Sequence, residues 1–276
     1  MKPLPQRILL LLLIWGCALV VGRPFFASAE PEKTIIYFYS PEANINKFKL
    51  LKIEFDTYLA QFGHYEFQPY SDKATFERDI KNHTSNALVL LSSWHFREIQ
   101  TGHHLTQIFV GERNGKTSQK RILVTATESA MNLDRAKTET IASVGSEEYI
   151  QNTLQEIFVE KLTEEAVKIF PVPKDIDALL AVGYGLAQAA LVTENSFSQL
   201  KTANPKLYRE MKIIGEGQEA LLLILAVPER FTEGAQEMSR IIAEMATNPA
   251  GKEKLNLLGL DGWQKADLSD KLNPEN

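Results

Sequence analysis

The sequence predicts an α/β protein of two lobes, each a mixed, mostly parallel sheet flanked by helices. Short β-rich runs alternate with helix-like segments after residue 30, and the connections between them are short. The alternation runs through two similar rounds, and no tandem repeat or low-complexity linker interrupts it. Such alternation is typical of sheets covered by helices on both faces. Two rounds favour two lobes over one large sheet.

The first round contains an amphipathic helix with apolar residues at three- and four-residue spacing, from Phe48 to Phe62, and Gly63 terminates it. A polar helix is expected at residues 73–81. The turn signal Arg113-Asn114-Gly115-Lys116 leads into the last strand of the round. The strands are expected at residues 34–39, 65–70, 87–91, 107–112 and 121–126.

The second round ends in two helices, a long amphipathic one built on Ala235 to Met245 and a shorter one before Gly259. The earlier helices of this round are expected at residues 148–162, 175–186 and 197–211, the last broken at Pro205. The strands are expected at residues 140–144, 167–172, 189–193, 212–215 and 221–227.

The N-terminus has the order of a secretory signal peptide. Lys2 and Arg7 precede an apolar run at residues 8–21, and the small-residue triplet Ala27-Ser28-Ala29 follows. The run is shorter than the roughly 20 residues that span a bilayer. We therefore expect a signal peptide at residues 1–29, cleavage near Ala29 and export to the periplasm.

Cys17 is the single cysteine, and it leaves a lipoprotein signal as a second interpretation of this segment. Trp15 and the continuing apolar run disfavour lipid attachment. Without Cys17 the mature chain has no thiol, which suits an oxidising compartment.

Composition excludes several classes of protein. The chain has 276 residues, 44% of them hydrophobic and 24% charged, a globular balance. Its formal net charge is −5, and removing Lys2, Arg7 and Arg23 makes the mature chain more acidic. Neither the sign nor any basic run favours nucleic acid as a partner.

Four stretches of the sequence together carry a resemblance to one known family. The most specific is residues 171–200, with a D-x-D-A-L helix start before a small-residue approach to a strand. Residues 243–263 are similar to the closing helix pair and its G-L-D-G-W ending. Tyr39-Ser40-Pro41-Glu42 and Arg113-Asn114-Gly115-Lys116 also match. In their order and spacing, these four stretches resemble the phosphonate- and phosphate-type solute-binding proteins of ABC importers.

The resemblance implies the type II periplasmic binding fold. Lobe 1 would comprise residues 30–116 and 218–276, and lobe 2 residues 117–217. Crossovers near residues 114–120 and 216–220 would form the hinge, and a ligand touching both lobes would select the closed form.

In such a fold the ligand lies beyond the carboxyl ends of the strands, where helix N-termini expose free N–H groups. Serine, threonine and asparagine there could equally be helix caps, and Tyr39 and Trp94 could equally pack in the core. The candidate ligand-binding residues are Tyr39, Ser40, Glu42, Ser92, Ser93, Trp94, Ser146, Glu147, Tyr149, Thr193, Glu194 and Asn195.

One departure from the family concerns the start of the lobe 2 helix. The family presents a hydroxyl-rich G-S-T-S-G run there, which forms an anion nest. Here residues 145–149 carry Glu147, Glu148 and Tyr149 instead. A carboxylate in the nest would repel a phosphonate, whereas a glutamate in the first helical turn would only complement the helix dipole. Cationic, zwitterionic and neutral ligands therefore stay open.

No metal or catalytic site is expected. The five histidines lack cysteine partners or metal-ligand spacing, and we interpret them as surface residues. The mixed charges at Glu112, Arg113 and residues 116–121 are interpreted as a solvated face. The chain has no G-x-S-x-G, P-loop or G-x-G-x-x-G motif after the first strand.

The resemblance implies a periplasmic solute-binding protein that captures a small molecule for an ABC importer, without catalysis or a cofactor. The alternative is a sensor or accessory protein of the same fold with a repurposed pocket. We expect a monomer whose partners are the ligand and an inner-membrane permease or sensor protein.

Overall fold

The computed structural model describes residues 33–42, 47–82, 86–159 and 167–266. The predicted signal peptide, Cys17 and His83 lie outside the described residues. Within them, no helix is both long enough and apolar enough to cross a membrane.

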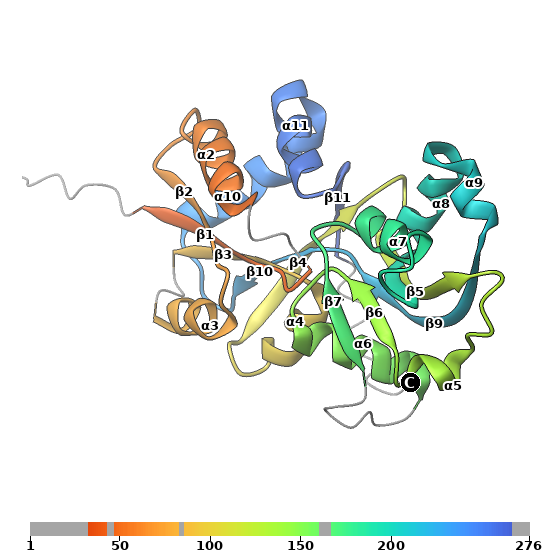
Figure 1. Cartoon of the computed structure of the whole chain (residues 1–276). Helices are drawn as coiled ribbons and strands as arrows, with labels where there is room; N and C mark the ends of the chain where they lie inside the picture. Colours follow the sequence, from red (N-terminus) through yellow and green to blue (C-terminus); the bar gives the residue numbers. More distant parts are fainter. Residues whose placement is uncertain (1–32, 43–46, 83–85, 160–166, 267–276) are drawn as a thin grey trace, which may run out of the picture. The chain divides into compact units, whose positions relative to one another are not determined.

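The first sheet has six strands in the order β11-β4-β10-β3-β1-β2 (Figure 1). β1 pairs in parallel with β2 and β3, whereas β10 runs antiparallel to β3 and β4, and β11 antiparallel to β4. The strands are β1 (Thr34–Tyr39), β2 (Tyr65–Pro69), β3 (Ala87–Leu91), β4 (Leu105–Glu112), β10 (Ile224–Pro228) and β11 (Gly262–Lys265).

The second sheet has five strands in the order β7-β6-β8-β5-β9. β6 pairs in parallel with β7 and β8, and β5 is antiparallel to β8 and β9. The strands are β5 (Ser118–Ala126), β6 (Thr140–Ser143), β7 (Lys168–Pro171), β8 (Ala189–Thr193) and β9 (Met211–Leu221).

The two separate mixed sheets confirm the predicted architecture. Antiparallel pairs are more frequent than expected, because β5 and β10, the strands that follow the two chain crossovers, run opposite to the parallel strands of their sheets, as does β11. The crossovers join β4 to β5 and β9 to β10.

Helices flank both sheets, as expected. The helices are α2 (Phe48–Leu59), α3 (Lys73–Asn82), α4 (Ser93–Ile99), α5 (Leu133–Ala136), α6 (Glu147–Phe158), α7 (Asp175–Gly183), α8 (Glu194–Ala203), α9 (Pro205–Arg209), α10 (Glu233–Ala243) and α11 (Pro249–Leu257), with a 3-10 turn at Glu244–Thr247. The first ends earlier than predicted, so that Phe62 lies beyond it and is 47% exposed.

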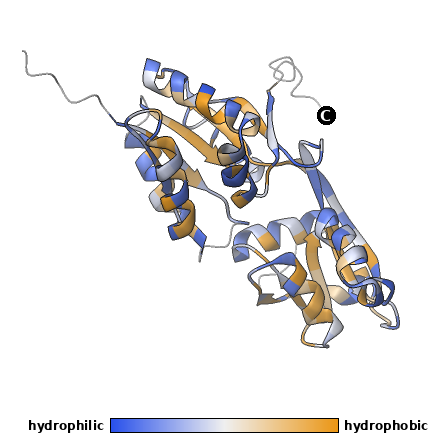
Figure 2. Ribbon diagram, turned by 90° about the horizontal axis from the view of Figure 1, so that it is seen from above, coloured by the Kyte–Doolittle hydropathy of each residue, from blue (hydrophilic) through white to orange (hydrophobic). Residues whose placement is uncertain are grey.

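The inner strands β1, β3, β8 and β10 are buried on both faces, which explains their nearly continuous apolar sequences. Successive side chains of β1 point to opposite faces. Ile36 and Phe38 pack in the cluster that contains α2 and α10, whereas Tyr37 and Tyr39 pack in the cluster that contains Phe76 of α3. In Figure 2 the inner strands are largely hydrophobic, whereas the helices carry both hydrophobic and hydrophilic residues.

Candidate functional site

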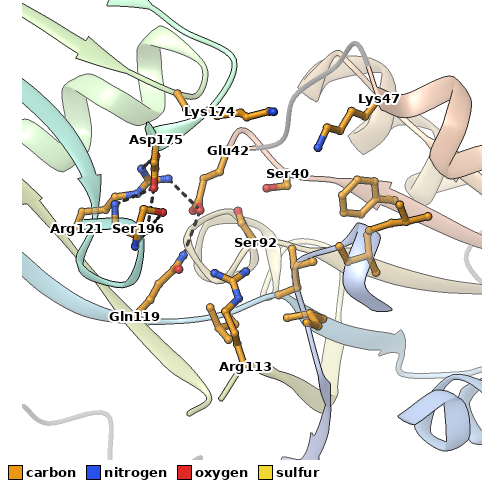
Figure 3. A pocket seen from close by; sticks show the side chains of 18 of the residues that line it. Ser40, Glu42, Lys47, Ser92, Arg113, Gln119, Arg121, Lys174, Asp175 and Ser196 are labelled. Atoms are coloured by element: carbon orange, nitrogen blue, oxygen red, sulfur yellow. Dashed lines mark hydrogen bonds and ion pairs between the residues drawn. The ribbon is translucent and has the colours of Figure 1, made fainter. Parts of the chain in front are cut away.

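A cavity of about 390 Å³ lies between residues of the two sheets, and we call it the inter-sheet cavity. Ser40 and Ser92 come from the ends of β1 and β3, and Thr193 ends β8 of the second sheet. Ligand sites are expected where strand ends meet in this way. Its polar and charged lining residues, most of them labelled in Figure 3, are Ser40, Glu42, Lys47, Ser92, Arg113, Gln119, Arg121, Lys174, Asp175, Thr193 and Ser196.

Arg121 is the most buried charge of this cavity, only 7% exposed near the start of β5. Its guanidinium donates to Asp175 Oδ1 at 3.1 Å and to Glu42 Oε2 at 3.4 Å. The Arg121 Nε also donates to the hydroxyl of Tyr149 at 3.3 Å. A buried charge is tolerated where such partners replace water.

Asp175 is held in the ionised form by its neighbours. Its Oδ2 accepts from the backbone N–H of Thr193 at 2.9 Å and from the Thr193 hydroxyl at 2.8 Å. Burial by itself raises the pKa of this carboxyl, but the Arg121 charge and the Thr193 hydrogen bonds outweigh it and leave the pKa below its usual value. For Arg121, burial lowers the pKa, but Tyr149, Asp175 and Glu42 raise it more, so the guanidinium stays charged.

Three further cations line the cavity: Lys47, Arg113 and Lys174. Arg113 follows β4 and donates its Nε to the carbonyl of Gly259, while its guanidinium faces the cavity (Figure 3). Burial lowers the pKa of Arg113. Among the residues that the structure describes, none of the three forms an ion pair with a carboxylate. They can therefore bind an external anion.

The two sheets also meet beside the cavity, at the start of α6. The Ser146 N–H donates to the carbonyl of Pro41 at 2.8 Å. The ring of Trp94 lies edge-on to that of Tyr149 at 5.9 Å. Residues 92–94 and 145–149 are thus neighbours, as a site between two sheets requires.

Four of the twelve residues predicted to bind the ligand line the inter-sheet cavity: Ser40, Glu42, Ser92 and Thr193. Ser92 and Thr193 also cap α4 and α8. Both interpretations considered for hydroxyl residues at strand ends therefore apply to these two.

The other eight residues lie elsewhere. Tyr39 is buried against Phe76, with ring centroids 5.4 Å apart. Ser93 donates to the carbonyl of Leu221 at 2.6 Å and lines a separate cavity of about 460 Å³. Glu194 and Asn195 line a third cavity, of about 340 Å³. The remaining four, which surround the start of α6 without lining the inter-sheet cavity, are Trp94, Ser146, Glu147 and Tyr149.

The two carboxylates of the altered loop are exposed. Glu147 accepts from Gln151 at 3.1 Å within α6, and Glu148 forms an ion pair with Lys73 at 3.1 Å. Neither lines the inter-sheet cavity. Their position in the first turn of α6 corresponds to the helix-dipole interpretation.

The solvated-face interpretation of residues 116–121 is wrong for Arg121. This side chain turns inward because Glu42 and Asp175, distant in sequence, supply its counter-charges. Sequence reasoning missed Arg121, Asp175 and Arg113 as cavity residues. An arginine at the edge of the apolar run of β5 was the available signal, because such a position needs a carboxylate partner.

The surface interpretation is also wrong for His95, which has no exposed surface. His95 Nε2 lies 2.8 Å from Glu77 Oε1, and Tyr39 and Phe76 pack around the ring. Burial lowers the pKa of His95 more than the contact with Glu77 raises it. The lowered pKa favours the neutral imidazole. Among the described residues, no group of three or more histidine, cysteine, aspartate or glutamate side chains could hold a metal ion.

Comparison with protein families gives one match. Residues 56–271 match the sequence model of the family described as "ABC transporter, phosphonate, periplasmic substrate-binding protein". A search of curated protein sequences gave no match.

Solved structures share the fold at low identity. XAC2383 from Xanthomonas citri bound to ATP has a TM-score of 0.60 at 12% identity, over 86% of this chain and 92% of that one. PhnD1 from Prochlorococcus marinus in complex with methylphosphonate has a TM-score of 0.59 at 14% identity, over 88% of this chain and 96% of that one. A binding protein component of an ABC phosphonate transporter from Pseudomonas aeruginosa has a TM-score of 0.59 at 13% identity, over 86% of this chain and 83% of that one. The predicted type II periplasmic binding fold is thereby confirmed.

Proposed function

Because the chain belongs to the family of periplasmic substrate-binding proteins of phosphonate ABC transporters, we propose that it captures a small anionic solute in the inter-sheet cavity for an importer. The observation that carries this proposal is the set of three cavity cations without an ion pair among the described residues, Lys47, Arg113 and Lys174. PhnD1, the solved neighbour named above, holds methylphosphonate.

The charge balance of the cavity favours an anion. Its lining carries the cations Lys47, Arg113, Arg121 and Lys174 but only two carboxylates, and both carboxylates pair with Arg121. An anion at Arg113 would replace the water that this half-buried guanidinium otherwise needs. The altered loop at residues 145–149 left a cationic ligand as an alternative, but the cations that line this cavity would repel such a ligand.

The size and polarity of the cavity also suit a small solute. Its volume of about 390 Å³ lies within the range of ligand pockets. The Ser40 and Ser92 hydroxyls can donate to ligand oxygens, and Leu51, Leu222 and Leu260 can contact an apolar part. No covalent step is proposed.

We keep the predicted lobes, residues 30–116 with 218–276 and residues 117–217, as part of this proposal. The ligand would touch both lobes, and the crossovers between β4 and β5 and between β9 and β10 would act as hinges. We also retain the cleaved signal peptide at residues 1–29, a monomeric state and delivery of the solute to an inner-membrane permease.

Replacing Arg113 by methionine is expected to weaken binding of methylphosphonate or inorganic phosphate at least about thirtyfold. The variant removes a charged donor that faces the ligand, and losing one such partner costs about 2–5 kcal/mol. A thermal-shift screen identifies the stabilising anion, because a ligand that binds the folded state raises the melting temperature. Titration calorimetry then compares the variant with the wild type.

Arg209→Met is the matched control, since Arg209 is exposed on α9 and does not line the cavity. Its affinity should equal that of the wild type. Equal affinities of Arg113→Met and wild type would contradict the proposed site. If none of the tested anions stabilises the wild type, the sensor or accessory interpretation replaces transport.

A further inference from the structure

Glu42 reaches from the end of the first strand to groups of the second sheet. It lies three residues after β1, and its Oε2 accepts from Arg121 and from Gln119 Nε2, each at 3.4 Å (Figure 3). Its side chain is 23% exposed, so these contacts are partly shielded from water. The protein's own carboxylate therefore lies where Arg121 would otherwise face the cavity.

The residue before it makes a second contact of the same kind. The Pro41 carbonyl accepts from the Ser146 N–H in the loop that begins α6, at 2.8 Å. A side chain at Gly145 would approach this carbonyl, because its Cβ would lie 3.1 Å from the Pro41 oxygen. The Pro41–Glu42 turn thus supplies acceptors to both anion-attracting groups of the second sheet, Arg121 and the α6 start.

The result is an uneven charge along the cavity. Arg121 faces two carboxylates, Glu42 and Asp175, so that this group of three side chains carries a net negative charge. Lys47, Arg113 and Lys174, which line the same cavity, have no ion pair among the described residues. An external anion is attracted by the second set and repelled by the first.

We propose that Glu42 is a specificity-determining residue, a tethered carboxylate that occupies the anion position beside Arg121. It confines an external anion to the Arg113 side of the cavity and disfavours dianions relative to monoanions. This inference rests on the proposed function, because it concerns the ligand of the same cavity. It adds to the proposed function the residue by which the cavity would select among anions of different charge.

Coulomb repulsion between Glu42 and the ligand grows in proportion to the ligand's charge. Replacing Glu42 by the isosteric glutamine removes one negative charge and leaves Arg121 paired with Asp175. A dianion therefore gains twice the free energy that a monoanion gains. A purely structural role of Glu42 would change the affinities for both anions by one common factor.

The test uses sulfate and methanesulfonate, two tetrahedral anions of fixed charge, with titration calorimetry on the wild-type mature chain and on Glu42→Gln. The gain expected in Glu42→Gln is about tenfold for methanesulfonate and about a hundredfold for sulfate. The ratio of sulfate to methanesulfonate affinity thus rises about tenfold. Glu42→Ala should raise it similarly, and Glu42→Asp, which keeps the charge, should leave it near the wild-type value.

Glu147→Gln is the matched control, since it removes an equal charge from an exposed carboxylate that does not line the cavity. The affinity ratio of Glu147→Gln should equal that of the wild type. A wild type that binds anions through Arg113, with an unchanged ratio in Glu42→Gln and Glu42→Ala, overturns this inference alone. Absence of anion binding in every variant and in the wild type overturns the proposed function as well.

Discussion

Replacing Arg121 by methionine is expected to lower the free energy of unfolding by about 3–5 kcal/mol. The substitution leaves Glu42 and Asp175 without their shared cation, and Asp175 is only 13% exposed. A buried carboxylate without a counter-charge is costly, because the methionine supplies no donors in place of water. Chemical denaturation monitored by circular dichroism measures the change.

Arg240→Met is the control for this prediction. Arg240 also pairs with two carboxylates, Glu237 and Glu244, but all three lie exposed on one surface of the helical segment. Ion pairs at the surface contribute little, so the unfolding midpoint of this variant should stay at the wild-type value. Equal effects of the two substitutions would refute the structural role given to Arg121.

Replacing Phe67 by alanine is expected to cost about 3–5 kcal/mol of unfolding free energy. Phe67 has no exposed surface, and its ring stacks on Phe55 at 4.4 Å and on Phe38 at 5.5 Å. Truncation leaves a cavity between the first sheet and α2, which the fixed strand and helix cannot fill. Denaturant titration measures the loss.

Phe62→Ala provides the comparison, since this ring is 47% exposed and contacts Tyr58 from beyond the end of α2. Its loss should cost less than about 1 kcal/mol, because less apolar surface is returned to water. A similar loss of stability in both variants would show that Phe67 does not anchor the core.

The sequence predicted β1, β3 and β8 with their observed ends, because each is a short apolar run bounded by polar residues. Strands whose extent is set by pairing with strands distant in the sequence were harder to predict. β9 extends over Met211–Leu221, although only residues 212–215 were predicted, because β5 pairs along it past Gly215 and Gly217. β11 was missed altogether, since only its pairing with β4 makes it a strand.

Short helices were missed for a different reason. No helix was predicted directly after β3, but α4 begins at Ser93, with Ser92 as its cap. A helix of seven residues is too short to show a periodic apolar pattern. The helix after β8 begins at Glu194, directly after the capping Thr193, three residues earlier than its first apolar residue indicated.

The candidate site was predictable to the extent that strand ends define it. Ser40, Glu42, Ser92 and Thr193 follow this rule and line the inter-sheet cavity. The pairing of Arg121 with Asp175 joins residues 54 positions apart, and no local pattern indicates it. The cavity's charge balance, and with it the preference for an anion, became visible only in three dimensions.

Binding of an anion in the inter-sheet cavity is tested most directly by crystals soaked in perrhenate, a tetrahedral monoanion with strong anomalous scattering. We expect the strongest anomalous peak in this cavity, within contact distance of the Arg113 guanidinium, and its loss in crystals of Arg113→Met. A strongest peak outside the cavity, unchanged in Arg113→Met, would contradict the account.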